Sequence, residues 1–296
     1  IDGVIAVGGG SSMDVAKAVA VLMGGSQRLP ELYGVDQVSG VRLPLILVPT
    51  TAGTGSEVTP VAVITTGETT KAGVSSAVLL PDVAVLDADL TLGLPPSVTA
   101  MTGVDAMVHA IEAYTSKHKK NPLSDNLAKQ ALSLLSRNIR TAVLEGGNRE
   151  ARANMLLGAM LAGQAFANAP VGAVHALAYP LGGHYHIPHG LSNSLVLPSV
   201  LEFNAPEASH LYAELAEIVI GEPVVGDDKA KTSALIDALR TLISDVSLPA
   251  TLQDSGVKEE DLEMLSKDAM LQQRLLMNNP REVTYEDARA IYRAAY

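Results

Sequence analysis

Asp105 and a group of histidines are the residues of this chain whose types and spacing best suit chemistry at a metal ion. Asp105 and His109 lie four residues apart, so in a helix both side chains lie on one face. Four of the seven histidines lie within residues 175–189: His175, His184, His186 and His189. One Asp with three His is a nitrogen and oxygen donor set suited to Fe(II), Zn(II) or a similar divalent ion. Such an ion, with one position open, can polarise the oxygen of an alcohol or a carbonyl group.

These histidines also have a purely structural interpretation. A single His is more often a core or surface residue than a ligand, and an Asp/His pair four residues apart is common by chance. The concentration of His in an apolar, glycine-rich stretch favours the metal site. Spacing alone does not choose among His184, His186 and His189.

A glycine-rich segment at residues 7–14 follows an apolar run and opens a helical pattern. Gly9 and Gly10 allow the backbone to approach a phosphate closely, and we expect Ser11 to cap the helix, whose free N–H groups attract an anion. Asp14 lies three residues after Ser11, the spacing of a capping box. The alternative is a strand–turn–helix junction that needs glycine only for its geometry. The segment does not match the dinucleotide fingerprint GxGxxG.

A second polar loop, PTTAGTGSE at residues 49–57, follows the next predicted strand. Its hydroxyl side chains and two glycines form a polar, adaptable lining, and ligands of open α/β sheets bind at the carboxyl ends of strands. We therefore expect this loop and the glycine-rich segment to form one binding site. The alternative is a solvated loop. Lys71, taken by itself, is a surface charge.

The spacing of apolar residues predicts which elements position these groups. Strand, helix, strand order before residue 95 indicates a mainly parallel sheet, and a turn at 66–69 indicates a hairpin. We expect buried strands at 4–7, 44–48, 61–65 and 83–86, and a helix at 13–23. From residue 96 on, helical periodicity predicts helices at 100–116, 124–143, 149–167, 206–220, 229–244, 259–269 and 285–295.

Local signals support two of these helix starts. Pro206 suits a first helical position, and Thr284 with Asp287 has the spacing of a capping box. The predicted architecture is an α/β domain at residues 1–95 followed by an all-α domain at residues 96–296. Small molecules bind preferentially between domains, so we expect the binding site in a cleft there.

Composition and charge exclude several classes of protein. The chain has 296 residues, 47% of them hydrophobic, which excludes a mainly disordered protein. A net charge of −11 argues against nucleic acid as a partner. The absence of cysteine excludes disulfides and thiolate chemistry and fits a cytoplasmic enzyme. The most apolar stretch, residues 155–174, has polar interruptions that argue against a membrane span.

Five motifs in order resemble the iron-containing (group III) alcohol dehydrogenase family over essentially the whole chain. They are GGGSSMDVAKA at 8–18, PTTAGTGSEVTP at 49–60, LLPDVAVLDADLTLGLPP at 79–96, TGVDAMVHAIEAYTS at 102–116 and GAVHALAYPLGGHYHIPHGLSN at 172–193. The resemblance implies a dehydroquinate synthase-like architecture, in which an α/β nucleotide-binding domain precedes an all-α metal-binding domain. It also implies a metal-dependent, NAD(P)-linked alcohol dehydrogenase or aldehyde reductase.

The resemblance further implies roles for individual residues. The metal ligands would be Asp105, His109, His175 and His189. We assign the cofactor to Gly9, Gly10, Ser11 and Asp14 in the glycine-rich segment, and to Thr50, Thr51 and Lys71. The metal would be Fe(II), with Zn(II) suited to the same ligands. The substrate would be a small alcohol or aldehyde, and the protein a homo-oligomer of two or more subunits.

The chain departs from the family pattern in two respects. Tyr179 stands four residues after His175, where many relatives carry a His linked to proton relay. A phenol titrates near pKa ~10 and an imidazole near ~6.5, so relay through Tyr179 would be weaker at neutral pH. His186 is a possible substitute. Family members also extend further at the N-terminus, so we expect the nucleotide-binding domain to be N-terminally truncated, and the sequence does not choose between NAD and NADP.

Two other functions compete with the dehydrogenase. One is a truncated or degenerate relative that binds metal without turnover, which the N-terminus and Tyr179 suggest. The other is a metal-dependent hydrolase built on the same Asp/His cluster. The two polar loops argue against the hydrolase, because a hydrolase does not need a dinucleotide cradle.

Overall fold

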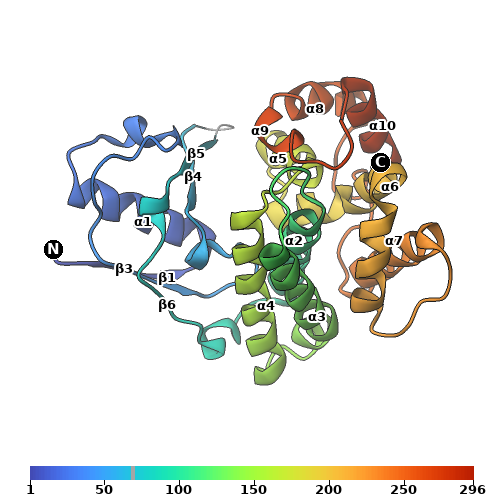
Figure 1. Cartoon of the computed structure of the whole chain (residues 1–296), viewed down its shortest axis with the longest axis horizontal. Helices are drawn as coiled ribbons and strands as arrows, with labels where there is room; N and C mark the ends of the chain where they lie inside the picture. Colours follow the sequence, from blue (N-terminus) through green and yellow to red (C-terminus); the bar gives the residue numbers. More distant parts are fainter. Residues whose placement is uncertain (68–70) are drawn as a thin grey trace.

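An α/β part and an all-helical part lie next to each other along the longest axis of the molecule (Figure 1). The structure is a computed structural model that describes every residue except 68–70 and the side chain of Lys71. Among the described residues, the last strand ends at Ala84 and every later regular element is helical. This order confirms the predicted α/β part followed by an all-α part.

A parallel sheet carries the glycine-rich segment. Its strands are β1 (Val4–Gly8), β3 (Leu45–Pro49) and β6 (Val83–Ala84), in the order β1-β3-β6. Helix α1 (Gly10–Gly24) packs on one face, where its apolar side chains meet Ala6, Leu45 and Leu47. The first strand was predicted to be buried, and this is wrong for the face of the sheet opposite α1. Ile5 and Val7 are 69% and 59% exposed, because no described element covers that side.

A second sheet contains the predicted hairpin. Its strands are β2 (Gly34–Val35), β4 (Val61–Thr65) and β5 (Lys71–Ser75), in the order β2-β5-β4. Strands β4 and β5 are antiparallel, and β2 and β5 are parallel. The turn predicted at 66–69 lies partly outside the described residues. The α/β part therefore contains two small sheets, one parallel and one mixed.

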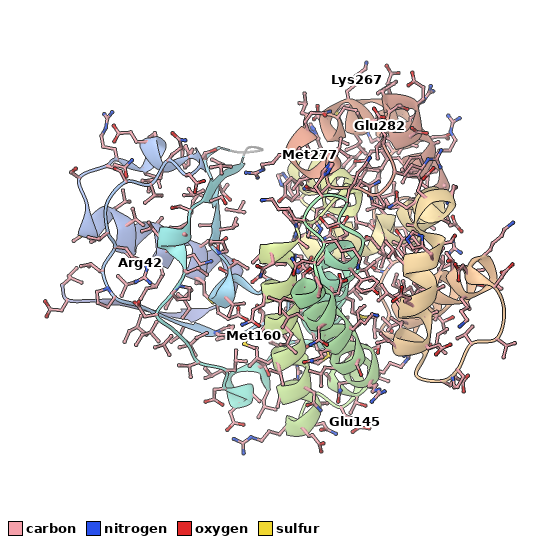
Figure 2. All side chains as sticks on the ribbon, in the orientation of Figure 1. Arg42, Glu145, Met160, Lys267, Met277 and Glu282 are labelled. Carbon is pink, nitrogen blue, oxygen red and sulfur yellow. The ribbon has the colours of Figure 1, made fainter. Side chains whose placement is uncertain are left out.

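Arg42 joins the segments that lead into the parallel strands. Its Nη1 lies 2.7 Å from Oδ2 of Asp82, and its Nε donates to the carbonyl of Val78 at 2.9 Å (Figure 2 labels Arg42). Asp82 in turn accepts from the backbone N–H of Leu45 at 2.8 Å. These bonds fix where β3 and β6 begin.

Helix α2 lies at the centre of the helical part and packs against α3, α4 and α6 (Figure 1). The helices are α2 (Pro96–Thr115), α3 (Pro122–Leu144), α4 (Arg149–Asn168), α5 (Ala173–Tyr185), α6 (His189–Ile220), α7 (Asp228–Asp245), α8 (Leu262–Ala269), α9 (Gln273–Leu276) and α10 (Tyr285–Ala295). Short 3-10 turns occur at Leu29–Leu32, Ser56–Val58, Ala77–Leu79, Ala88–Thr91 and Glu259–Asp261.

Helix α6 is where the helix prediction fails most clearly. It begins at His189 and runs through both Pro198 and Pro206, so Pro206 is an interior residue and not a first one. An interior proline removes one helical hydrogen bond, but packing of α6 against α2, α5 and α7 supports the helix. The capping box of Thr284 and Asp287 at the start of α10 is confirmed.

Among the described residues, no single helix is long and apolar enough to cross a membrane. The apolar stretch at residues 155–174 divides between α4 and α5, which pass the same test only as a pair bent by 108°.

Lys17 ties α1 to the polar loop and to β4. Its side chain is fully buried, and Nζ donates to Oγ of Ser56 at 2.9 Å, the carbonyl of Thr59 at 2.9 Å and the carbonyl of Val61 at 2.7 Å. Burial lowers the pKa of Lys17 to about 8, against the opposing charges of Asp14 and Glu57. Glu57 is also buried, and burial raises its pKa to about 7.

We expect the substitution Glu57→Gln to remove part of the pH dependence of the free energy of unfolding. Because the pKa of Glu57 rises from 4.5 to about 7 on folding, the folded state binds more protons between these values. Its contribution to stability is therefore complete below pH 4.5 and is lost as the pH rises through 7. The difference between the two pKa values corresponds to a change of about 3 kcal/mol in the free energy of unfolding.

Urea unfolding across this pH interval measures the effect. The wild type should lose stability relative to Glu57→Gln as the pH rises, while Glu260→Gln, at an exposed position, should follow the wild type. If the free energies of unfolding of the wild type and Glu57→Gln changed with pH in parallel, the raised pKa of Glu57 would be contradicted.

Candidate functional site

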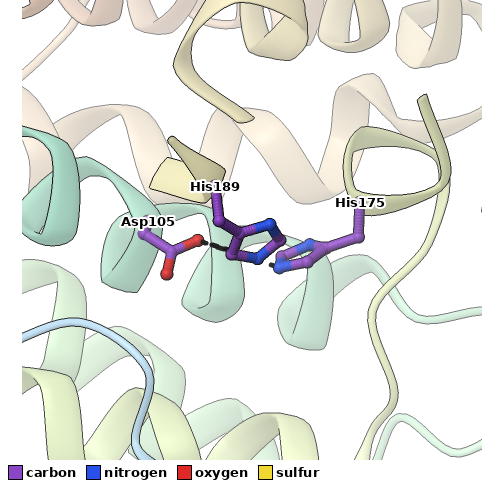
Figure 3. A group of neighbouring side chains, drawn as sticks. All are labelled: Asp105, His175 and His189. Carbon is purple, nitrogen blue, oxygen red and sulfur yellow. Dashed lines mark ion pairs between the residues drawn. The ribbon is translucent and has the colours of Figure 1, made fainter. Parts of the chain in front are cut away.

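Three of the predicted metal ligands meet at one point in the helical part. Asp105 comes from α2, His175 from the first turn of α5, and His189 from the start of α6 (Figure 3). Their ligand atoms all lie within 4.8 Å of one another. Nε2 of His175 is 3.9 Å and Nε2 of His189 is 3.7 Å from Oδ1 of Asp105. One carboxylate and two imidazoles that converge in this way can hold a divalent ion.

A close approach of α6 to α2 brings His189 beside Asp105. Helix α6 begins directly after Pro188, and its second residue is Gly190. A Cβ atom at Gly190 would lie 2.2 Å from the carbonyl oxygen of Met101 and 3.3 Å from Cβ of Asp105. Only glycine fits at such a distance from backbone, so this position sets the spacing between the two helices.

His109, the fourth predicted ligand, lies beside this group and not within it. Its ring stacks on Phe166, with centroids 4.5 Å apart, and on His175, with centroids 4.8 Å apart. Among the described residues, its buried Nδ1 has no hydrogen-bond partner. Burial lowers the pKa of His109 to about 3, so the imidazole is neutral. A buried, unpartnered imidazole nitrogen at this place fits a metal-binding role.

The groups around Asp105 and His175 outweigh the effect of burial on the pKa of each residue. Burial would raise the pKa of Asp105, but His109, His189, His175 and the amide of Asn193 outweigh it and lower that pKa. Burial would lower the pKa of His175, but Glu112 and Asp105 outweigh it and raise that pKa. Asp105 is only 2% exposed, so its carboxylate depends on these partners.

Sequence reasoning missed two residues that contact the group. Nδ2 of Asn193 donates to Oδ1 of Asp105 at 2.6 Å and lies 3.3 and 3.4 Å from Nε2 of His175 and His189. Oε2 of Glu112 lies 2.6 Å from Nδ1 of His175. Helical spacing is a signal for Asn193, which follows His189 by four positions. No local pattern points to Glu112, because its partner His175 lies 63 positions away.

The two polar loops of the α/β part lie side by side, as predicted. The N–H of Thr50 donates to the carbonyl of Gly8 at 3.0 Å. A Cβ atom at Gly9 would lie 3.4 Å from Oγ1 of Thr51, and one at Gly10 would lie 2.7 Å from Cγ2 of Thr54. The loops meet because β1 and β3 are parallel neighbours, so their carboxyl ends lie at one edge of the sheet.

The prediction that Ser11 caps α1 is wrong. Gly9 is the N-cap, no side chain caps the helix, and Ser11 is exposed in the first turn. Asp14 does not form a capping box with Ser11. It accepts instead from Oγ of Ser56 at 2.6 Å and from the N–H of Val63 at 2.9 Å. The reason is that the extended backbone of Gly9 starts the helix earlier, which leaves the first turn without a side-chain cap.

The polar loop also contacts the helix that carries Asp105. A Cβ atom at Gly53 would lie 2.8 Å from Cβ of Thr102, one turn before Asp105 in α2. Gly55 has a φ of 60°, and a Cβ there would lie 2.5 Å from Cα of Gly163 in α4. The loops and the metal group therefore adjoin through direct packing of the two parts.

The remaining predicted site residues lie around these features. Tyr179 is half-buried, with its ring centroid 5.8 Å from that of His189, and burial raises the pKa of its phenol above 10. His186 is exposed and ends α5 in a left-handed conformation, with a φ of 55°. His184 pairs with Asp268 at the surface instead of joining the metal group. The backbone of Lys71 opens β5, and its side chain lies outside the described part of the chain.

Two family descriptions match the chain in succession. Residues 1–88 match "Iron-containing alcohol dehydrogenase", and residues 99–296 match "Fe-containing alcohol dehydrogenase family, C-terminal". The long-chain-alcohol dehydrogenase 1 of Geobacillus thermodenitrificans is 44% identical over 298 residues, which are 100% of this chain and 75% of that protein.

Solved structures show the same similarity. The crystal structure of a 1,3-propanediol oxidoreductase has a TM-score of 0.95 and 38% identity, and the match covers 100% of this chain and 77% of that one. The sulfoacetaldehyde reductase of Bifidobacterium kashiwanohense, in complex with NAD+, has a TM-score of 0.88 and 33% identity, and the match covers 99% and 76%.

The fold, the metal-binding triad and these relatives define an oxidoreductase of the alcohol dehydrogenase class. The chain belongs to the iron-containing alcohol dehydrogenase family. The resemblance and the enzyme class predicted from the sequence are confirmed.

We expect Gly190→Ala to weaken both the fold and metal binding. The added methyl group meets the carbonyl of Met101, so α6 must move away from α2 and take His189 with it. Such overpacking costs about 1–3 kcal/mol. Thermal unfolding and Zn(II) titration of the metal-free chain measure the two effects.

Gly182→Ala in α5 is the matched control, because its nearest contact would be an ordinary 3.5 Å from the carbonyl of Ile187. The control should keep metal affinity and stability. Equal behaviour of the two variants would show that the approach of α6 to α2 does not position His189.

Proposed function

We propose that this protein is a metal-dependent, NAD(P)-linked alcohol dehydrogenase that also catalyses the reverse reduction of aldehydes. The observation that carries the proposal is the placement of the metal group beside the two polar loops. Asp105, His175 and His189 converge on ligand atoms within 4.8 Å, and the polar loop packs on the same helix at Thr102.

Asp105, His175 and His189 would hold the metal, and His109 would complete the set. The unpartnered, buried Nδ1 of His109 and its stacking on His175 support that assignment. The family indicates Fe(II), and the same donors suit Zn(II). When bound, such an ion polarises the oxygen of the alcohol or carbonyl group. The four protein residues bind and orient and do not act as acid or base.

The cofactor would lie on the loops of the α/β part. Gly9, Gly10 and Ser11 would bind its pyrophosphate through the uncapped start of α1, where N–H groups attract an anion. Thr50, Thr51 and Lys71 would line the rest of the cofactor, and Asp14 would support the loop through Ser56. A relative solved with NAD+ favours NAD, although NADP fits the same chemistry. Residues 1–95 and 96–296 would then act as the cofactor-binding and metal-binding domains.

Two residues would handle the proton of the alcohol. Tyr179 remains a neutral phenol at physiological pH, because burial raises its pKa above 10. It can donate a hydrogen bond, but it would be a weaker proton relay than an imidazole. The exposed His186 would carry the proton to solvent. The substrate would be a small alcohol or aldehyde, and the active protein a cytoplasmic homo-oligomer of two or more subunits.

A metal-binding relative without turnover is the second candidate. Tyr179 favours it, because the phenol is a poorer proton relay than an imidazole at neutral pH. Metal bound in stoichiometric amount with no oxidation of any alcohol in a broad panel would support this candidate.

We expect His189→Ala to lower metal content and to lower turnover by at least about 10–100-fold, the cost of losing only a hydrogen-bond partner of a ligand, because here a ligand nitrogen itself is lost. Elemental analysis measures the metal, and absorbance of reduced nicotinamide measures turnover with short alcohols and aldehydes. His210→Ala, at an exposed position of α6, should behave as the wild type. Full activity and full metal content in His189→Ala would overturn the assignment.

A further inference from the structure

Glu112 is a buried acidic residue of α2 that the proposed reaction does not use. It is 6% exposed, and no Lys or Arg among the described residues forms an ion pair with it. Both of its oxygen atoms accept hydrogen bonds. Oε1 accepts from the backbone N–H of Val174 at 2.7 Å, and Oε2 accepts from Nδ1 of His175 at 2.6 Å. A buried carboxylate is costly, so its position beside His175 calls for a physical role.

The contact determines which nitrogen atom of His175 carries the proton. A carboxylate can only accept a hydrogen bond, so Nδ1 of His175 must be the donor. In the neutral imidazole, Nε2 then carries a free lone pair. Nε2 is the atom that lies 3.9 Å from Oδ1 of Asp105 in the metal group.

Asn193 indicates the same tautomer independently. Its Nδ2 must be a donor toward Asp105, because Oδ1 of Asp105 can only accept. The same Nδ2 lies 3.3 Å from Nε2 of His175. An amide nitrogen cannot accept, so a proton on that Nε2 would find no acceptor in Asn193. Two neighbours on opposite sides of the ring thus require one protonation pattern.

Glu112 also holds the backbone on which His175 stands. The N-cap of α5 is Gly172, which has no side chain to satisfy the free N–H groups of the first turn. Glu112 takes that place by accepting from Val174, and the positive end of the helix dipole stabilises its charge. A cavity of about 10 Å³ lies beside Glu112, about the space of one water molecule. Its other polar side chains are all neutral: Thr115, Asn204, Tyr212, Asn278 and Asn279.

We propose that Glu112 is a positioning residue of the metal centre, which holds His175 in the Nδ1-protonated tautomer so that Nε2 faces the ion. The proposal rests on the metal centre of the proposed function and adds a residue outside its ligand set. A carboxylate that fixes a ligating His in this way also makes it a better donor, and losing such a partner typically weakens metal binding by about 10–100-fold.

The decisive variant is Glu112→Gln. In Gln, one of the two acceptor oxygens of Glu112 is replaced by an NH2 group, which can only donate. The amide therefore cannot accept from Val174 at one atom and from His175 at the other. Titration of the metal-free full chain with Zn(II) should show an affinity lower by about 10–100-fold. At a pH above the pKa of His175, where its imidazole is neutral, the ¹⁵N NMR shifts of His175 in the metal-free chain should show the Nδ1-protonated tautomer in the wild type. The variant should show a mixture of tautomers.

Two further variants keep the test interpretable. Glu214→Gln removes an exposed carboxylate that also contacts α2, through Tyr114, and should leave zinc affinity and the His175 signals unchanged. Glu112→Asp keeps the charge but shortens the side chain, so its affinity should lie between those of the wild type and Glu112→Gln. Circular dichroism verifies that each variant is folded.

The outcomes separate the two proposals. Wild-type zinc affinity in a folded Glu112→Gln, or an Nε2-protonated His175 in the metal-free wild type, would overturn the role of Glu112 and leave the metal centre standing. If Glu112→Gln fails to fold, the His175 tautomer in the wild type and the zinc affinity of Glu112→Asp still test the role of Glu112. A wild type that binds no metal would overturn the proposed function, and the role of Glu112 with it.

Discussion

The buried carboxylate of Asp105 is the constraint on which the arrangement of the helical part depends. A charge that is 2% exposed is costly unless other groups compensate it. The compensating groups come from separate helices: His175 from α5, and His189 and Asn193 from α6. Helices α5 and α6 must therefore meet α2 at one point. Gly190 has no side chain, which permits the close approach of α6 to α2. A divalent metal ion bound among these groups would compensate the charge of Asp105 directly.

The same helix connects the metal group to the α/β part. The polar loop packs on α2 at Thr102 through Gly53, and it packs on α4 through Gly55. Within the α/β part, Lys17 joins α1 to this loop through Ser56, so the start of α1 and the loop form one unit. A nicotinamide cofactor bound on that unit would be held at a defined distance from the metal group. Hydride transfer depends on such positioning more than on any single acid or base.

Local patterns predicted much of the fold, and long-range contacts explain the rest. Apolar periodicity predicted α3, α4 and α10, because each buries one stripe. It also predicted α2, which is buried on all sides from Gly103 to Thr115. It missed α5 and the first half of α6, where glycine and proline are unfavourable locally and packing compensates. Helical spacing paired Asp105 with His109, whereas the choice of His189 came from resemblance. Glu112 was missed because its role depends on a bond to a residue 63 positions away.

Anomalous diffraction from crystals of the Fe(II)-loaded protein, with data collected on both sides of the iron absorption edge, would locate the metal. We expect one strong anomalous peak among Asp105, His175 and His189, at the roughly 2.0–2.2 Å distances at which His nitrogen and carboxylate oxygen bind such ions. The same map would show whether His109 is the fourth ligand. A peak at another place, or no peak although iron is bound in solution, would contradict a metal centre at these residues.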